Sequence, residues 1–376
     1  VTLNLNHSFD DWPIDVGVEN EYINFYRESR TSGHRFNIKP FVSIPIESTG
    51  AFFRPKFSMQ YSQYYLDNLE LGKEKNFTRV LPIVSVDSGL IFERDFKFAN
   101  SGFLHTIEPR LFYLLIPKKQ QEKVTIFDTA EYDFSYASLF RENRFSGNDM
   151  VQDANQLTLA VSSSLIDSDT GVERLRLSVG EILYFRDREV TLSREPETYG
   201  WSNLVAELRG KLTDNWSFSS GIQWNPKLND VTRGHAEITY RNSNQPGKLI
   251  NLGYRYRKEQ NEQNEQNKVK NIIQADASFR WPIYDNWHAV GRWQYSLKHE
   301  KTKDSFLGLE KESCCWRFRL IWRRYTNSLN DPNDANSFGQ MEEGFFVQME
   351  LKGFGALGNN AEEFLERNLN GYQRIE

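Results

Sequence analysis

The sequence has no long apolar run. Its longest apolar stretch is about Leu111 to Pro117, whereas a helix that crosses a membrane needs roughly 20 apolar residues. A helical membrane protein is therefore excluded, although aromatic residues make up 14% of the 376 residues. Because the mean hydropathy is nevertheless negative, the large apolar side chains must be dispersed among polar ones.

Cysteine is almost absent. The only two cysteines, Cys314 and Cys315, are adjacent. Adjacent residues of an extended chain point to opposite faces, which does not suit a disulfide between them. Any disulfide partner would then lie outside this sequence. A count of two fits either a cytosolic protein with incidental thiols or an exported protein with a few specific bridges.

The sequence also lacks an excess of basic charge. Its 46 basic and 51 acidic residues give a net charge of −5. They form no basic domain, so no nucleic-acid partner is expected. The chain begins at Val1 without a signal-peptide pattern, which indicates a mature or truncated chain and leaves its compartment open.

The sequence does contain recurrent alternation of apolar and polar residues, with the period of two that is typical of β-strands. In 204–212 and 216–224 the apolar residues share one parity, and the tight-turn sequence TDNW joins the two segments. Segments 273–281 and 287–295 repeat the pattern around YDNW. Two hairpins with a shared D-N-W turn predict a meander of antiparallel strands.

The same alternation along the whole chain predicts an all-β fold of roughly sixteen strands. The predicted strands are 15–28, 34–46, 51–65, 78–96, 102–117, 155–167, 173–187, 201–213, 216–225, 233–242, 248–258, 270–281, 287–299, 304–312, 315–325 and 343–355. Short turns strictly alternate with long connections, and the long ones are 66–77, 118–154, 188–200, 259–269 and 326–342.

Long strands with aromatic residues near their ends and unequal loops are typical of an antiparallel transmembrane β-barrel with short periplasmic turns and long extracellular loops. A soluble β-sandwich has shorter strands and no such asymmetry. Pro109 interrupts an otherwise apolar strand. Because proline removes a ladder donor, it predicts a bulge or local opening near 108–110.

Charged residues predict which face looks into the barrel. In 316–323, apolar residues alternate with Arg317, Arg319 and Arg323. An arginine on the lipid face near the midplane costs roughly 2–4 kcal/mol, so these arginines should face the lumen. Inward charged residues would solvate a channel, or hold an anionic headgroup or a protein plug. The residues predicted to do so are Glu207, Arg209, Arg280, Arg292, Arg317, Arg319 and Arg323.

Five features, in order along the chain, carry a family resemblance. They are HTIEPRLFYLLIP with a later FDT (105–129), LFRENRFSGNDMVQDANQLTLAVSS (139–163), ERLRLSVGEILYFRDR (173–188), the cysteine pair, and GFFVQMELKGFGALG (344–358). Together they resemble the barrel domain of the LptD family of LPS-assembly outer-membrane proteins, over nearly the whole chain.

The resemblance implies that residues 1–376 are the C-terminal portion of a barrel of about twenty-six strands, with a periplasmic jelly-roll domain and the first strands preceding Val1. It implies a protein of the Gram-negative outer membrane that inserts lipopolysaccharide into the outer leaflet through a lumen and a lateral gate, without a cofactor. The implied partners are lipopolysaccharide, the plug lipoprotein LptE, the periplasmic bridge protein LptA and the barrel-assembly machinery.

The resemblance also gives roles to two sets of residues. Cys314 and Cys315 would each bond to a cysteine of the upstream domain. The terminal strand would part from the first strand of the complete barrel to form the gate. The residues assigned to that gate strand are Gly344, Phe346, Gln348, Glu350 and Phe354.

No catalytic constellation is visible, so we expect no enzyme. The six histidines are scattered without metal-ligand spacing, and no nucleophile elbow, phosphate loop or zinc pattern occurs. The carboxylates of ENRFSGND (142–149) fit either a divalent-cation site between lipopolysaccharide phosphates or, as the plainer interpretation, a solvated loop. A passive porin-like channel of about sixteen strands is the alternative function, although paired cysteines have no evident use in it.

Overall fold

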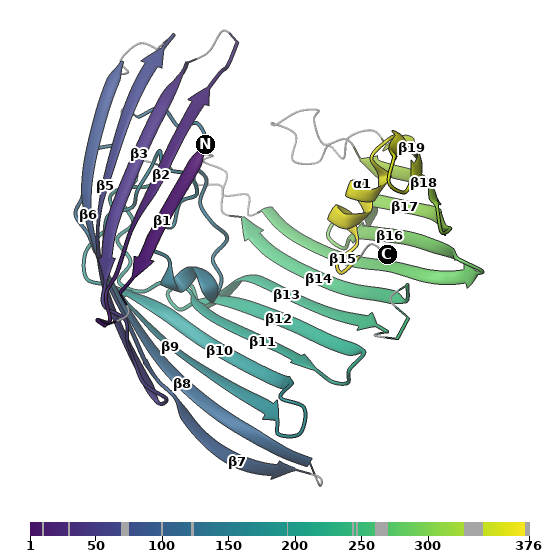
Figure 1. The fold of residues 1–376 in the computed structure, drawn as a ribbon, viewed down its shortest axis with the longest axis horizontal. Helices are drawn as coiled ribbons and strands as arrows, with labels where there is room; N and C mark the ends of the chain where they lie inside the picture. Colours follow the sequence, from purple (N-terminus) through teal and green to yellow (C-terminus); the bar gives the residue numbers. More distant parts are fainter. Residues whose placement is uncertain are drawn as a thin grey trace. The chain divides into compact units, whose positions relative to one another are not determined.

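The fold is known from a computed structural model of the chain (Figure 1). The structure describes residues 1–9, 11–28, 31–68, 75–98, 101–121, 124–193, 195–242, 244–245, 247–259, 270–326 and 341–372. Of the predicted long connections, residues 69–74, 260–269 and 327–340 lie outside this described part.

The described part of the chain consists of twenty β-strands and two short helical segments. These are β1 (Thr2–Ser8), β2 (Asp15–Phe25), β3 (Ser32–Ser43), β4 (Ile46–Glu47), β5 (Ala51–Asp67), β6 (Asn76–Leu90), β7 (Phe92–Phe98), β8 (Ser101–Ile116), η1 (Ala137–Phe140), β9 (Ala154–Asp167), β10 (Glu173–Tyr184), β11 (Leu204–Lys211), β12 (Trp216–Asn225), β13 (Asp230–Arg241), β14 (Leu249–Glu259), β15 (Lys270–Tyr284), β16 (Trp287–Ser296), β17 (Lys301–Glu312), β18 (Trp316–Thr326), β19 (Met341–Leu351), β20 (Gly355–Gly358) and α1 (Ala361–Asn368). The predicted all-β antiparallel fold is confirmed. Neither helical segment has the length or apolar character that a membrane-crossing helix requires.

The structure has four more strands than the predicted sixteen, for two reasons. β1, β4 and β20 are short, with seven, two and four residues, so they offer too few positions for alternation to stand out. The predicted strand 78–96 is divided at Ile91 into β6 and β7.

The break at Ile91 lies across from Pro109. Strand β6 pairs with the part of β8 that begins at Arg110, and β7 pairs with the part that ends at Ile107, so Pro109 pairs with neither. The pairing of β8 with β9 continues through Pro109 without a shift. The predicted local opening near 108–110 therefore occurs on the β6–β7 side of β8. This is consistent with a proline that has no N–H to donate to the ladder.

The chain divides into two compact units. Unit 1 consists of 1–172, 176–206 and 225–228, and unit 2 consists of 173–175, 207–224 and 229–376. Each unit is described by itself below.

In unit 1, β2 pairs with β1 and β3, β5 pairs with β3 and β6, and β8 pairs with β6, β7 and β9. The described residues of 117–153, between β8 and β9, pack against one face of these strands, which we call the inner face. Along β3, Arg35 and Asn37 point to the inner face and are buried, whereas His34 and Phe36 are exposed on the outer face. The predicted alternation thus separates a polar covered face from an apolar exposed one.

In unit 2, consecutive strands from β13 to β20 pair antiparallel. Residues 359–372, which we call the strap, include α1 and lie against β16–β19 on the face that we call the inner face of this unit (Figure 1). The outer face exposes apolar side chains such as Leu307, Trp322 and Phe345. Both units therefore have the apolar-out, polar-in pattern of transmembrane strands.

The short turns of unit 2 lie at one end of its strands, as predicted. The Glu312 N–H donates to the Asn286 carbonyl at 3.1 Å, and the Arg241 N–H donates to the Asn215 carbonyl at 2.8 Å. The turns at Asp214, Asp285 and Ser313 thus share this end. The predicted strict alternation of lengths is wrong, however, because only residues 297–300 join β16 to β17 at the other end.

Candidate functional site

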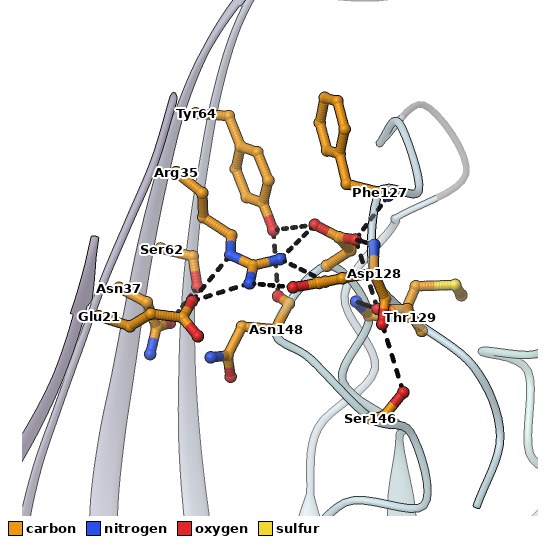
Figure 2. Close-up of polar contacts among 12 residues, drawn as sticks. Glu21, Arg35, Asn37, Ser62, Tyr64, Phe127, Asp128, Thr129, Ser146 and Asn148 are labelled. Carbon is orange, nitrogen blue, oxygen red and sulfur yellow. Dashed lines mark hydrogen bonds and ion pairs between the residues drawn. The ribbon is translucent and has the colours of Figure 1, made fainter. Parts of the chain in front are cut away.

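Residues 117–153 are fastened to the inner face of unit 1 by a buried ion cluster around Arg35 (Figure 2). The Arg35 side chain is 0% exposed. Its guanidinium donates to Asp149 at 2.6 Å, to Asp128 at 2.7 Å and to Glu21 on β2 at 3.0 Å. One strand arginine thereby holds two carboxylates that come from distant points of the same connecting segment.

Neighbouring groups add further hydrogen bonds to this cluster. The Asp149 carboxylate accepts from the backbone N–H groups of Phe127 and Asp128 at 2.7 and 3.0 Å. Arg79, on β6, donates to the carbonyl oxygens of Asn148 and Asp149, both at 2.6 Å. A buried charge is tolerated when it is paired and hydrogen-bonded in this way, and removing one partner typically costs about 3–5 kcal/mol.

A second anchor lies at Glu142. Its carboxylate is 2.7 Å from the Lys39 ammonium and 3.0 Å from that of Lys56. Burial alone would raise the pKa of Glu142, but the two ammonium groups outweigh burial and lower it. The acidic end groups of ENRFSGND are therefore held by strand cations, so the interpretation as a solvated loop is wrong. No group of His, Cys, Asp or Glu side chains in the described residues could hold a metal ion.

In unit 2 the strap covers the inner face with an apolar core. Asn360 caps α1, because its side-chain oxygen accepts the Glu363 N–H at 3.2 Å. The buried members of this core are Val290, Phe306, Ile321, Ala361, Leu365, Leu369 and Tyr372, with Phe346 and Phe364 packed against them. Hydrogen bonds extend the attachment to β13, β14, β17 and β19: Arg241 to the Gly371 carbonyl, Asn251 to the Asn370 carbonyl, Tyr372 to Glu310, and the Glu362 N–H to Gln348.

Three of the predicted lumen arginines lie beneath the strap. The side chains of Arg280, Arg317 and Arg319 are at most 2% exposed. Glu310 on β17 pairs with Arg280 at 2.5 Å and with Arg319 at 2.8 Å. The strap residue Glu362 lies 3.4 Å from Arg319, so the strap adds a carboxylate to the cluster.

The other predicted lumen residues fall into two groups. Arg292 donates to Asn368 of the strap at 2.8 Å, and Arg323 lies over the strap ring of Phe364 at 5.2 Å. The structure therefore brings five predicted arginines around the strap. Glu207 and Arg209 form a separate pair on β11, 3.1 Å apart.

The predicted extent of the terminal strand is wrong. β19 ends at Leu351, and β20 follows as an additional strand paired to β19. Gly353 and Gly355 have φ of +88° and +133°, a region that glycine adopts without steric cost, and they reverse the chain there. Phe354 lies in this reversal and is 94% exposed.

Within β19 the predicted gate residues share the inner face. Phe346 stacks on Phe364 of the strap at 4.7 Å between ring centroids, and Gln348 and Glu350 are buried. Gly344 has the same parity. The neighbours of opposite parity are the exposed apolar residues Phe345, Val347, Met349 and Leu351. The gate role of this strand remains a prediction.

Cys314 and Cys315 lie in the short turn between β17 and β18, and both are free and exposed. The expectation that their side chains point to opposite faces is wrong, since their sulfur atoms lie 2.8 Å apart. The reason is that both residues belong to the turn and not to an extended strand. The hydrogen bond from the Cys315 thiol lowers the pKa of Cys314.

Sequence reasoning missed the Arg35 cluster, although a usable signal was present. In HRFNIKP (34–40), the residues Arg35, Asn37 and Lys39 alternate with His34, Phe36 and Ile38. The parity argument that turned the arginines of 316–323 inward applies equally to Arg35. No local pattern, however, could have identified Asp128 and Asp149 as its partners.

Comparison with known proteins identifies the family. Residues 1–287 match LptD, described as LPS transport system D. The LPS-assembly protein LptD of Methylococcus capsulatus is 37% identical over 98% of this chain, that of Nitrosococcus oceani 39% over 96%, and that of Pseudomonas aeruginosa 38% over 93%. The chain spans less than half of these relatives, at 38%, 46% and 41% of their lengths.

Solved structures with a similar arrangement include the siderophore receptor PirA of Acinetobacter baumannii, with a TM-score of 0.43 and 8% identity, covering 93% of this chain and 64% of the receptor. The ferric citrate transporter FecA has a TM-score of 0.39 and 10% identity, covering 93% of this chain and 62% of FecA.

The resemblance inferred from the sequence motifs is confirmed by the family match. The relatives are similar to this chain along nearly its whole length, and both units have strands of the transmembrane type. This chain is therefore an outer-membrane protein of the LptD family.

Proposed function

We propose that this chain is the C-terminal portion of a barrel that inserts lipopolysaccharide into the outer leaflet of the outer membrane. The observation that carries this proposal is the match to the LPS transport family over residues 1–287. The polar parity of the inner faces supports it where that face stays open, as at Arg209, because an amphiphile that is half sugar needs a hydrated wall for its headgroup. This family is not a known enzyme family, and the porin-like alternative gains no support from the match.

The upstream part of such a protein would supply the remaining strands and the periplasmic jelly-roll domain. LptE would sit inside the completed barrel as a plug, LptA would deliver lipopolysaccharide to the upstream domain, and the barrel-assembly machinery would fold the barrel. The inward residue Arg209, which pairs with Glu207 and is 57% exposed, would be open to such a plug or to a headgroup. The buried arginines beneath the strap would serve structure instead.

The lateral gate would lie beside the β19–β20 hairpin. β20 pairs with β19 at only four positions, from Leu351↔Gly355 to Gln348↔Gly358. A strand of four residues can form only a few hydrogen bonds with its other neighbour, so the two strands would part at low cost. Cross-linking β20 to the first strand of the full barrel should then stop lipopolysaccharide delivery while the barrel stays folded, and normal delivery after efficient cross-linking would contradict the gate.

Cys314 and Cys315 would each form a disulfide with the upstream domain. Their exposure in one turn supports this role, since a partner segment can reach both sulfur atoms. In an oxidising periplasm, such bridges would fix the upstream domain to the barrel wall.

A depletion experiment tests the function as a whole. In cells that lack their own LptD, the full-length protein containing this chain should restore surface lipopolysaccharide and impermeability to large antibiotics. The variant in which serine replaces both Cys314 and Cys315 should leave the cells sensitive to antibiotics and should lack the oxidised mobility shift. If the wild-type protein reaches the outer membrane folded and surface lipopolysaccharide stays absent, the proposed function is wrong.

A further inference from the structure

A polar pocket of about 540 Å³ lies between residues 117–153 and the inner face of unit 1. Its lining includes Asn37 on β3, Gln60 on β5 and, from the connecting segment, Tyr132, Arg141 and Asn148. Its volume falls within the usual range of small-ligand sites. The amide-rich lining does not suit an apolar ligand such as an acyl chain.

Three amide side chains form one hydrogen-bonded wall of the pocket. The Gln60 amide N–H group donates to the Asn37 side-chain oxygen at 2.9 Å and to that of Asn148 at 3.2 Å. Asn37 and Gln60 are each only 4% exposed. The three amides are thereby fixed in position before any ligand arrives.

Each of these amides uses only half of its capacity within the described residues. The side-chain N–H groups of Asn37 and Asn148 and the side-chain oxygen of Gln60 have no hydrogen-bond partner there. None of these atoms is among the fully buried unpaired atoms of the described residues, so they reach open space. Two unused donors and one unused acceptor at the wall of a pocket are complementary to hydroxyl groups, which both donate and accept.

The lining also carries charged side chains. Its carboxylates Glu19 and Glu21 are paired with Lys39 at 3.7 Å and with Arg35 at 2.8 Å. The Arg141 guanidinium lies 4.0 Å from the centre of the Tyr132 ring, and it has no carboxylate partner among the described residues. Glu142, beside it, is already paired with Lys39 and Lys56. Arg141 is therefore the group available to an anionic substituent, which guanidinium binds with two parallel hydrogen bonds.

We propose that this pocket binds a saccharide with an acidic substituent, the amides of Asn37, Gln60 and Asn148 contacting its hydroxyl groups and Arg141 its acidic group. The inference rests on the proposed function and deepens it, since it assigns a subsite for the sugar part of the transported molecule. Phosphate and carboxylate share the required anionic oxygens, so the experiment compares both.

The test is titration calorimetry on the full-length protein purified from outer membranes in detergent. The probes are deacylated lipopolysaccharide (phosphorylated), trigalacturonic acid (carboxylated) and maltotriose (neutral). The variants are Arg141→Gln, Asn148→Asp, which keeps the acceptor for Gln60 and removes the donor, and the control Lys119→Gln on the exposed part of the same segment. Unchanged heat-modifiable mobility on gels verifies that each variant is folded.

We expect at least one acidic probe to bind wild-type protein, and Arg141→Gln and Asn148→Asp each to weaken that binding by about tenfold. Lys119→Gln should leave it unchanged. The acidic probe that binds more tightly identifies the substituent. Failure of both acidic probes to bind, maltotriose binding as tightly as they do, or full affinity in Arg141→Gln would overturn the inference.

The same variants in the depletion strain separate this inference from the proposed function. Restored surface lipopolysaccharide in wild type, together with full affinity in Arg141→Gln, means that the pocket inference alone is wrong. Saccharide binding that depends on Arg141, with no restoration by the wild-type protein, supports the pocket and contradicts the proposed function.

Discussion

The two units cover their inner faces with different chemistry. In unit 1 the connecting segment 117–153 is held by a buried ion cluster, in which Arg35 lies among Asp128, Asp149 and Glu21, together with apolar contacts such as those of Leu139 with the strands. In unit 2 the strap is held mainly by apolar packing, with Leu365 and its neighbours on the strands. Both coverings combine charge with apolar packing, since Glu362 of the strap also lies 3.4 Å from Arg319. The difference is one of weight: the ion cluster within the covering segment is larger in unit 1, and the apolar core of the strap is more continuous in unit 2.

The largest loss of stability is expected in unit 1. Arg35→Met leaves the buried carboxylate of Asp149 and the partly exposed carboxylate of Asp128 without this cation, so the free energy of unfolding should fall by about 3–5 kcal/mol. Urea denaturation of the purified protein, followed by tryptophan fluorescence, measures the loss. Protease cleavage within 117–153 should increase at the same time.

The matched control for that variant is Arg54→Met. Arg54 pairs with Glu47 at 2.7 Å, but the two side chains are 43% and 54% exposed, so the change should cost under about 1 kcal/mol. Equal small losses for both arginines would contradict the view that buried charge holds the segment.

Unit 2 should respond instead to loss of apolar volume. Leu365→Ala removes a buried side chain from the strap core, and about 2–4 kcal/mol of its packing should be lost. Amide hydrogen exchange should then accelerate in α1 and at the strap ends. Glu366→Ala, its exposed neighbour on α1, should change exchange little, and equal acceleration in both variants would contradict apolar packing as the cause.

A pH series sharpens the comparison at the second anchor of unit 1. The lowered pKa of Glu142 means that its stabilisation is present above the unfolded value near 4.3 and is lost as pH falls through the folded pKa. Glu142→Gln should therefore cost about 1–3 kcal/mol at pH 7, and wild type and variant should converge as the carboxyl is protonated. A constant gap at low pH would mean that the side chain acts by shape and not by charge.

The smallest expected effect is at the cysteine turn of unit 2. Because the Cys315 thiol lowers the pKa of Cys314, Cys314 should react first with iodoacetamide near pH 8 in the reduced protein. Cys315→Ser should slow alkylation of Cys314 by a few fold. Peptide mass spectrometry gives both rates, and an unchanged rate would show that the contact between the thiols is not maintained in solution.

The sequence by itself determined the strands and the two faces of the sheet. Alternation with a period of two is a local property, because successive side chains of a strand point to opposite faces. It therefore placed Arg317 and Arg319 on one face of their strand, where both are buried, and the motif order indicated the family. The strands near the ends of the chain could not be predicted in this way. β1 and β20 are too short for the alternation to stand out, and the glycines at 353 and 355 reverse the backbone.

Only the tertiary structure decided what covers those faces. Arg35 meets Asp149 across 114 residues of sequence, and Arg241 meets Gly371 across 130. A carboxylate in a polar connecting segment looks the same in sequence whether it is solvated, binds a cation or enters a buried ion pair. Which of these occurs depends on the charges that the assembled strands bring within about 3 Å, and local patterns carry no information about that distance.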